Sequence, residues 1–260
     1  MKEMAMSRAT SLVGAGGAVV LTGAGISVDS GIPDFRSPGG LWERYPIEEY
    51  ATIHAFKQDP AKVWRLFDEL EELLGQAEPN GGHLALARLE AVGLVDAIVT
   101  QNIDNLHQSA GSRKVIEYHG STQRLVCIAC QKTYPASHRK KAGKGAIPRC
   151  ACGQALKPDV VLFDEYIPPE AEHQARRAMD KARCCIVCGT SATVYPAAAL
   201  PLRAQSVGAP IIEINLAPTP LSAQIADVFL QGTTTEVLSE LARRVLEARK
   251  ADSPPAQGVE

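Results

Sequence analysis

Four short apolar runs, spaced through the chain, constrain the fold of this protein more than any other feature. They lie at residues 18–23, 95–100, 184–189 and 210–215 and are rich in valine, isoleucine and cysteine. Apolar runs of this length, bounded by glycine or polar residues, are typical of strands that are buried on both faces of a sheet. They predict a parallel sheet, because antiparallel strands with one solvated face would alternate apolar and polar residues.

Stretches with helical periodicity separate these runs. Asp59-Pro60 is a typical helix start, and the apolar residues after it fall on one helical face. These residues are Val63, Leu66, Phe67, Leu70, Leu73 and Leu74. Residues 83–92 and 236–249 predict two more helices, whereas the polar, Pro-containing residues 251–260 predict a disordered tail. Strands that alternate with helices predict an α/β fold.

Composition narrows the class of protein. A chain of 260 residues with 45% hydrophobic content can bury one large core and a small second one. The 27 basic residues nearly balance the 29 acidic residues, so we expect no nucleic-acid partner. No run approaches the roughly 18 apolar residues of a membrane span, and the amino terminus lacks an apolar secretory stretch. We therefore expect no membrane partner and a cytoplasmic location.

A glycine-rich stretch, TGAGISVDSGIPDFRS at residues 22–37, follows the first predicted strand. Gly23 and Gly25 would let the backbone approach a ligand, and amides at the start of a following helix can hold a diphosphate. Val28, however, stands where a third glycine would complete the dinucleotide pattern. A glycine-rich turn that binds no ligand therefore remains an alternative.

Gln101, Asn102 and Asp104 directly follow the run at 95–100. Because ligands of parallel sheets bind at the carboxyl ends of the strands, these side chains are candidates for contacts with hydroxyl and carboxamide groups. The alternative is that Asp104 caps the next helix while Asn102 forms a turn. We expect His107, one turn into that helix, to be a structural or surface histidine.

His119 ends a short predicted strand and precedes a glycine that permits close contact. An imidazole with an ordinary pKa of about 6.5 can act as a general base at neutral pH. A single histidine is more often structural, so His119 alone does not decide between the two roles.

Four cysteines form a pattern typical of zinc sites, Cys127-x-x-Cys130 followed by Cys150-x-Cys152. The segment around them has few large apolar residues, and zinc contributes about 10 to 16 kcal/mol to the folding of finger-like peptides. Four protein ligands leave no open position for water, which predicts a structural zinc ion. The cysteines at 184, 185 and 188 lie in a strand pattern and are expected to be buried hydrophobic residues. The basic run at 139–144 predicts a solvated loop of the metal module, with docking of an acidic partner as the alternative.

Several motifs resemble the sirtuins when taken together and in order. They are GAGIS with SGIPDFRS, then TQNID, HG, two cysteine pairs, KPDVVLFDE, GTSATVYPAA and EIN, within residues 12–246. The resemblance implies an NAD-dependent protein lysine deacylase with a Rossmann-like domain and a smaller domain that is helical and binds zinc. The larger domain would comprise residues 1–40, 80–121 and 158–250, and the smaller one residues 41–79 and 122–157.

The resemblance also implies roles for individual residues. His119 would be the general base, and Asn102 would be catalytic through its hold on the nicotinamide end of NAD. Cofactor contacts would come from Gly23, Ala24, Gly25, Ile26, Asp34, Phe35, Arg36, Gln101, Asn102, Ile103, Asp104, Gly189, Thr190, Ser191, Asn215 and Gly232. Acyl-lysine proteins or peptides would contact Ile103, Val161, Phe163, Asp164 and Glu165. Zinc would be held by Cys127, Cys130, Cys150 and Cys152.

The chain departs from the sirtuin pattern at three places. The second cysteine pair is C-x-C, which makes Cys152 the least typical zinc ligand. Asp164 replaces a glycine, and its extra negative charge predicts a preference for substrates with basic flanking residues. Phe67 and Leu70 align with the Tyr and Arg of sirtuins that prefer acidic acyl groups, so acetyl or another neutral acyl group is expected.

Three other functions remain alternatives. Mono-ADP-ribosyl transfer to protein would use the same scaffold and the same first chemical step. A nicotinamide-dependent oxidoreductase fits the strand-Gly-x-Gly start but lacks the third glycine. A zinc-ribbon module that binds nucleic acid would use basic residues of the cysteine region, against which the net charge of -2 argues.

Overall fold

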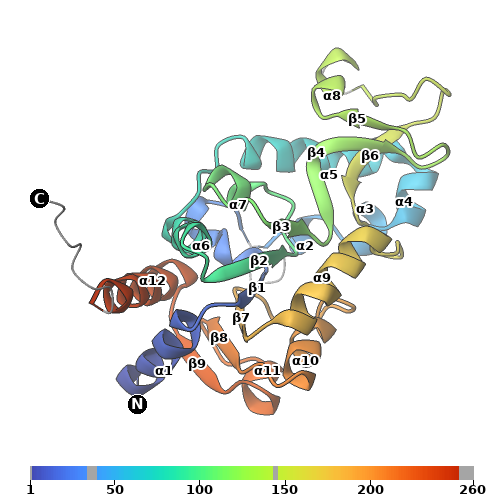
Figure 1. Ribbon diagram of the computed structural model, residues 1–260. Helices are drawn as coiled ribbons and strands as arrows, with labels where there is room; N and C mark the ends of the chain where they lie inside the picture. The colour runs from blue at the N-terminus through green and yellow to red at the C-terminus, as the bar shows by residue number, and fades with distance from the viewer. Residues whose placement is uncertain (1, 34–39, 143–145, 252–260) are drawn as a thin grey trace, which may run out of the picture.

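The structure is a computed structural model, which describes residues 2–33, 40–142 and 146–251. Its larger sheet has six strands in the order β3-β2-β1-β7-β8-β9, and every neighbouring pair is parallel (Figure 1). The strands are β1 (Ala18–Thr22), β2 (Val95–Thr100), β3 (Val115–Glu117), β7 (Cys184–Cys188), β8 (Ile211–Asn215) and β9 (Val228–Gln231). The four apolar runs thus form the four central strands, as predicted.

The central strands are buried because helices cover both faces of this sheet. Helices α1 (Lys2–Gly14), α6 (Gly81–Ala91) and α12 (Thr234–Ala251) pack on one face, in a core with Val20, Ile98 and Ile186. Helices α9 (Pro169–Lys181), α10 (Ala199–Ser206) and α11 (Pro220–Gln224) pack on the other. All five residues of β7 are buried, so its three cysteines are core residues, as their strand pattern indicated.

A second, smaller part of the molecule lies at the opposite end from α1 and α12 (Figure 1). Its helices are α2 (Leu41–Arg44), α3 (Ile47–Tyr50), α4 (Ile53–Gln58), α5 (Pro60–Leu74) and α8 (Ser137–Ala142). Its antiparallel sheet has the order β5-β4-β6, from β4 (Gly120–Cys127), β5 (Thr133–Pro135) and β6 (Leu156–Val160). The helices α2–α5 and the region that holds the four cysteines share one core, in which Phe56, Phe67, Leu125 and Leu156 are buried.

Local sequence sets the ends of two of these helices. The side chain of Asp59 accepts a hydrogen bond from Lys62 N at 3.1 Å and Pro60 opens α5, so the predicted helix start is correct. The basic run behaves differently from the solvated loop that was predicted. Arg139 is buried, ion-paired with Asp68 at 2.7 Å and placed over the ring of Trp64, because α8 packs against α5.

The two parts join at the carboxyl edge of the large sheet. The chain passes from β3 through Tyr118 and His119 directly into β4, and it returns from β6 through residues 161–165. Val161 N donates to His119 O at 2.8 Å, and Phe163 N donates to Ala51 O at 2.8 Å. The returning segment therefore touches both the end of β3 and the helical region.

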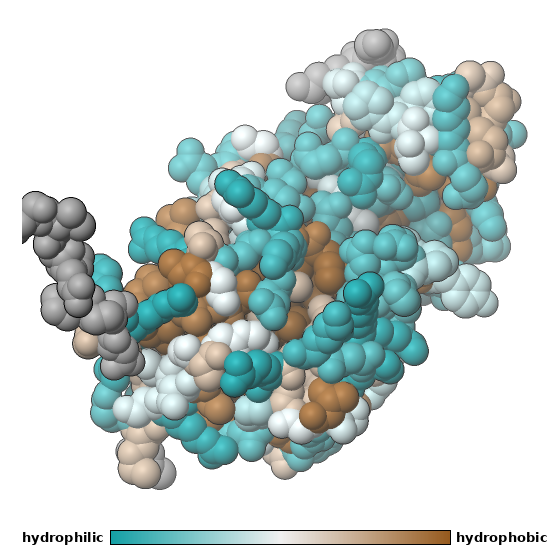
Figure 2. Space-filling view, viewed as in Figure 1, coloured by the Kyte–Doolittle hydropathy of each residue, from teal (hydrophilic) through white to brown (hydrophobic). Residues whose placement is uncertain are grey.

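None of the helices in the described ranges combines the length and the hydropathy needed to span a bilayer. Figure 2 shows one face of the molecule, over which hydrophilic residues are spread with smaller hydrophobic areas between them.

Candidate active site

Five neighbouring strands, β1, β2, β7, β8 and β9, end at one edge of the large sheet, and the loops that follow them form a connected polar region. Twelve predicted cofactor residues lie in these loops, and Asn215 is the last residue of β8. The twelve are Gly23, Ala24, Gly25, Ile26, Gln101, Asn102, Ile103, Asp104, Gly189, Thr190, Ser191 and Gly232. Three others, Asp34, Phe35 and Arg36, lie outside the described residues.

The glycine-rich turn after β1 packs directly on the loop after β7. Gly25 N donates to Gly189 O at 2.8 Å, and a Cβ on Gly25 would lie 2.7 Å from Gly189 Cα. A Cβ on Gly23 would lie 2.7 Å from Cβ of Thr190. Gly189 itself has a φ of 62°, a conformation that favours glycine. These glycines are therefore needed for contact between two loops, whether or not the turn also binds a ligand.

A buried serine links the amide and the carboxylate that follow β2. Asn102 Nδ2 donates to Ser27 Oγ at 3.1 Å, and Ser27 Oγ donates to Asp104 Oδ2 at 2.7 Å. Ser27 is 1% exposed and Asn102 is 7% exposed. Sequence reasoning missed Ser27, although it directly follows the glycine turn that was singled out.

Asp104 makes the helix-start hydrogen bond that was weighed as one alternative, and its contact with a ligand stays a prediction. Its Oδ1 accepts a hydrogen bond from Leu106 N at 2.9 Å at the start of α7 (Leu106–Ser109). Its Oδ2 is bound to Ser27. The hydrogen bond from Leu106 N fixes the carboxylate of Asp104, so that Oδ2 is held toward Ser27 and Asn102.

Gln101 connects three strand ends. Its Nε2 donates to Thr190 Oγ1 at 3.0 Å and to Thr22 O at 3.4 Å. Its main-chain oxygen lies 3.1 Å from Nδ1 of His119. Because a carbonyl only accepts, Nδ1 of His119 is the donor, and Nε2 carries the free lone pair.

His119 thus has the tautomer of a general base. Burial lowers the pKa of its imidazole, and the hydrogen bond to Gln101 opposes this shift. The ring is therefore neutral at pH 7 and can accept a proton at Nε2. Tyr118 lies behind it, with ring centroids 5.6 Å apart, and donates to Glu172. Burial and that carboxylate raise the pKa of Tyr118, which keeps the phenol protonated.

Side-chain and main-chain hydrogen bonds join the loops that follow β7, β8 and β9. Asn215 Nδ2 donates to Thr190 O at 2.9 Å, and Gly232 N donates to Asn215 O at 3.1 Å. Ser191 Oγ lies 2.9 Å from Thr193 Oγ1. The loops after β7, β8 and β9 are thus tied to one another.

The predicted substrate segment, Val161–Glu165, is braced by a buried lysine. Lys157 Nζ lies 3.0 Å from Glu165 Oε2 and donates to Val160 O at 2.6 Å. Glu165 Oε2 also accepts a hydrogen bond from Leu162 N at 2.9 Å. The side chain of Lys157 is 5% exposed, and sequence reasoning had assigned it no role.

Residues of the same segment differ in exposure. Phe163 and Ile103 are partly buried against the core of the smaller part, and Phe163 meets the ring of Trp42 edge-on at 6.1 Å. Asp164 is exposed and has a φ of 67°. This left-handed conformation explains why a glycine suits the position, since only glycine adopts it without steric cost.

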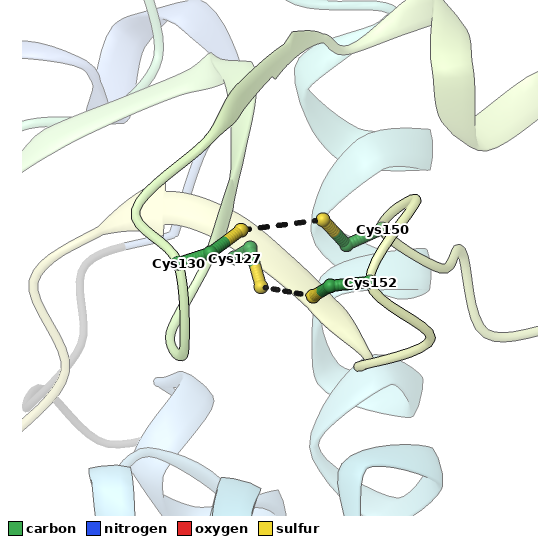
Figure 3. A group of neighbouring side chains, drawn as sticks. All are labelled: Cys127, Cys130, Cys150 and Cys152. Carbon is green, nitrogen blue, oxygen red and sulfur yellow. Dashed lines mark hydrogen bonds between the residues drawn. The ribbon is translucent and has the colours of Figure 1, made fainter.

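Four cysteine sulfurs gather at the end of the smaller part. The Sγ atoms of Cys127, Cys130, Cys150 and Cys152 all lie within 4.8 Å of one another (Figure 3). Cys127 and Cys152 are 3.6 Å apart, and Cys130 and Cys150 are 3.5 Å apart. A tetrahedral zinc ion with Zn–S bonds of about 2.3 Å requires sulfur separations of about 3.8 Å. The donor set and its spacing therefore fit zinc, with the C-x-C pair included.

Backbone amides favour thiolates at this cluster. The N–H of Cys130 lowers the pKa of Cys127, and the N–H of Cys152 lowers the pKa of Cys150 to about 6. Each of the two turns thus stabilises one thiolate, whereas hydrogen bonds with the neighbouring sulfurs raise the pKa of the second cysteine of each pair, Cys130 and Cys152.

Known proteins resemble this chain over most of its length. A model described as the Sir2 family matches residues 23–196. The chain is 48% identical to NAD-dependent protein deacylase 2 of Pyrobaculum aerophilum, and the match covers 91% of this chain and 95% of that protein. It is 46% identical to NAD-dependent protein deacylase 1 of Archaeoglobus fulgidus, with 88% and 93% covered.

Solved structures agree with the chain in fold. A Sir2 homolog in complex with NAD has a TM-score of 0.87 and 43% identity, and the match covers 93% of this chain and 94% of that one. Sir2Af2 bound to a myristoylated histone peptide has a TM-score of 0.80 and 38% identity, with 96% and 100% covered.

Proposed function

The chain belongs to the Sir2 family, and from this premise we propose that it is an NAD-dependent protein lysine deacetylase. The predicted sirtuin resemblance and Rossmann-like α/β fold are confirmed by the family match, the structural relatives and the sheet order. In the reaction, lysine transfers its acyl group to ADP-ribose, nicotinamide leaves, and one water molecule is consumed. The products are free lysine, nicotinamide and 2′-O-acetyl-ADP-ribose.

One observation carries this proposal. The end of β2 places an amide and a carboxylate, bridged by Ser27, beside a neutral histidine of fixed tautomer. Asn102 and Asp104 offer a donor and an acceptor to a carboxamide, and they would hold the nicotinamide end of NAD. A nicotinamide-dependent oxidoreductase is disfavoured because Val28 stands where the third glycine of its dinucleotide pattern would be.

His119 would act after the glycosidic bond to nicotinamide is broken. With Nδ1 bonded to Gln101 O, its Nε2 would take a proton through the ribose hydroxyls, so that the 2′-oxygen attacks the acyl carbon. The lowered pKa keeps this nitrogen unprotonated at neutral pH. His119 would therefore not have to lose a proton before Nε2 acts as the base.

The loops after β1, β7, β8 and β9 would hold the rest of NAD. The amides of Ala24–Ile26 and the Gly189–Ser191 loop would contact diphosphate and ribose, and Asn215 and Gly232 would lie toward the adenosine. The contacts that join these loops support the assignment, because they make one continuous surface from four strand ends.

Acyl-lysine substrates would bind beside Val161–Glu165. An extended peptide can add to this segment through main-chain hydrogen bonds, which tolerate many sequences. Phe35, Ile103, Val161 and Phe163 would surround the acyl chain. Phe67 and Leu70, at 5% and 4% exposure, are buried core residues, so an acidic acyl group would meet no partner charge from them. This supports acetyl or another neutral acyl group.

A structural zinc ion held by the four cysteines would stabilise the smaller domain. The shared core of residues from α2–α5 with Leu125, Cys127 and Leu156 supports placing residues 41–79 and 122–157 in one domain. Residues 1–40, 80–121 and 158–250 would form the NAD-binding domain. A cytoplasmic location remains a prediction.

Product analysis tests the proposal. Mass spectrometry of an acetyl-lysine peptide incubated with NAD should find free lysine and 2′-O-acetyl-ADP-ribose, and less product from the succinyl-lysine form of the peptide. His119→Ala should lose this product, whereas His173→Ala, an exposed histidine on α9, should keep it. ADP-ribosylated protein without deacylated peptide would instead favour the transferase alternative.

A further inference from the structure

His107 is a buried histidine that the proposed reaction does not use. It lies in the short helix α7, is 1% exposed, and meets the ring of His83 with centroids 4.9 Å apart. It is therefore no surface residue, which was one of the two places predicted for it. Its ring contacts Thr22, which is the last residue of β1.

The ring makes one hydrogen bond within the described part of the chain. His107 Nε2 lies 3.0 Å from Thr22 Oγ1, and Nδ1 has no partner among the described residues. Thr22 Oγ1 in turn donates to Thr100 Oγ1 at 2.9 Å. Since a hydroxyl has one proton, Thr22 must accept from His107, and the proton of the ring is on Nε2.

The series of hydrogen bonds from His107 through Thr22 and Thr100 ends at Asn102. Asn102 N donates to Thr100 Oγ1 at 3.1 Å, so the hydroxyl of Thr100 fixes the main chain of the residue that would hold nicotinamide. The same Thr22 also accepts through its carbonyl from Gln101 N at 3.0 Å. Gln101 O orients His119. Thr22 thus supports Asn102 through the hydroxyl of Thr100, and it supports His119 through the main chain of Gln101.

The environment keeps the donor of this chain uncharged. Burial, and to a lesser extent the neighbouring His83, lowers the pKa of His107 to about 3. Burial also lowers the pKa of His83 to about 4. Both rings are therefore neutral at working pH, and the Nε2–H of His107 does not change with pH.

We propose that His107 is a positioning residue, whose Nε2–H holds Thr22 so that Asn102 and the Gln101–His119 pair keep their reactive placement. The inference rests on the proposed function, because it assigns His107 to the support of that site. A ring that only filled space would be replaceable by phenylalanine without loss of turnover.

Four variants separate the two roles. His107→Phe keeps the ring and removes the donor, and His107→Gln restores a donor at a similar reach. Thr22→Val keeps the shape of Thr22 and removes its hydroxyl. His83→Phe is the matched control, since His83 is equally buried and touches His107 but makes no hydrogen bond to Thr22.

Steady-state kinetics on an acetyl-lysine peptide give the first readout. We expect His107→Phe and Thr22→Val to lower kcat about tenfold, because each leaves a buried polar group of the chain unpaired. The KM for the peptide should change less than about threefold, and His107→Gln should recover kcat to within about threefold. His83→Phe should keep kcat within about twofold.

The opposite results would overturn the inference. They are a folded His107→Phe or Thr22→Val with wild-type kcat, or a His83→Phe that loses kcat as strongly as His107→Phe. An inactive wild-type protein would instead refute the proposed function.

Nuclear magnetic resonance of ¹⁵N-histidine-labelled wild-type protein gives a readout independent of activity. The ring of His107 should show the Nε2–H tautomer, unchanged between about pH 6 and pH 9. An Nδ1–H tautomer or a titrating ring would contradict the hydrogen-bond chain even if the kinetics agreed.

Discussion

Replacing Lys157 by methionine should loosen the segment that we assign to substrate binding. Lys157 Nζ bonds to Glu165 Oε2 at 3.0 Å and to two carbonyl oxygens, those of Pro158 and Val160. Methionine keeps much of the apolar stem, so the loss is mainly that of the charge and its hydrogen bonds. Removing one partner of a fully buried ion pair costs about 3 to 5 kcal/mol. The side chain of Glu165 is 22% exposed and can gain water, so we expect a loss of about 2 to 3 kcal/mol.

Thermal unfolding and peptide kinetics measure the two consequences. For a chain of this size, 2 to 3 kcal/mol corresponds to a fall in Tm of about 4 to 12 °C. The KM for the acyl-lysine peptide should rise, because Leu162 N and the main chain of the segment lose their brace, while kcat changes less. Lys181→Met, an exposed lysine on α9, is the matched control and should alter neither quantity.

A double-mutant cycle with Glu165→Gln decides whether the ion pair is the cause. The loss for Lys157→Met should shrink by at least about 1 kcal/mol when Glu165 is already neutral. A fall in stability below about 0.5 kcal/mol for Lys157→Met, or fully additive losses, would refute this account of the segment.

Other predictions concern pH, the metal and the substrate. Because the folded pKa of His107 is about 3, below its unfolded value, unfolded chains bind the extra proton below about pH 6.5. Acidification from pH 7 to pH 5 should therefore cost about 2 kcal/mol of stability through His107, in addition to the loss through His83, whose pKa of about 4 acts in the same direction. The free energy of unfolding of His107→Phe should vary less with pH, and an unchanged slope would contradict the lowered pKa. By elemental analysis, reduced wild-type protein should contain one zinc ion per chain. Cys152→Ser should lose this ion, whereas Cys184→Ser should keep it. A full complement of zinc in Cys152→Ser would show that Cys152 is not a ligand. At low salt, kcat/KM should be higher for Lys-flanked than for Glu-flanked peptides, and Asp164→Gly should reduce the difference; equal wild-type values would exclude a role for the Asp164 charge.

Periodic features of the sequence predicted the large sheet well. The four apolar runs became β1, β2, β7 and β8 nearly residue for residue, because burial on both faces demands an unbroken apolar run. Edge strand β9 and helix α1 were missed. Helix α1 mixes apolar and polar residues without a clear stripe, and only Ala9 and Val13 among its residues are buried.

Site residues were predictable where a motif marked them and not where tertiary contact decides their role. The motifs pointed to Asn102, Asp104 and His119, which the fold brings to one sheet edge. Ser27 matters through Asp104, which lies 77 positions along the chain, and no local pattern predicts such a contact. Lys157 bonds to Val160 and Glu165 close by in sequence, but its burial depends on packing that no local pattern predicts. The burial of His107 likewise depends on packing against β1 and His83.

Arg139 illustrates the limit of charge patterns. A basic run is ordinarily solvated, yet Arg139 is buried over Trp64 and paired with Asp68. The apolar face predicted for α5 did not include Trp64, which is buried because the residues that cover it come from the cysteine region.

Exchange of labelled nicotinamide into NAD, measured beside deacylation of an acetyl-lysine peptide, tests the central claim most directly. If Asn102 acts in breaking the glycosidic bond and His119 acts afterwards, Asn102→Ala should lose both exchange and deacylation. His119→Ala should keep exchange while deacylation falls by at least about a hundredfold. Loss of exchange in His119→Ala equal to its loss of deacylation, or normal exchange in Asn102→Ala, would contradict the roles assigned to this site.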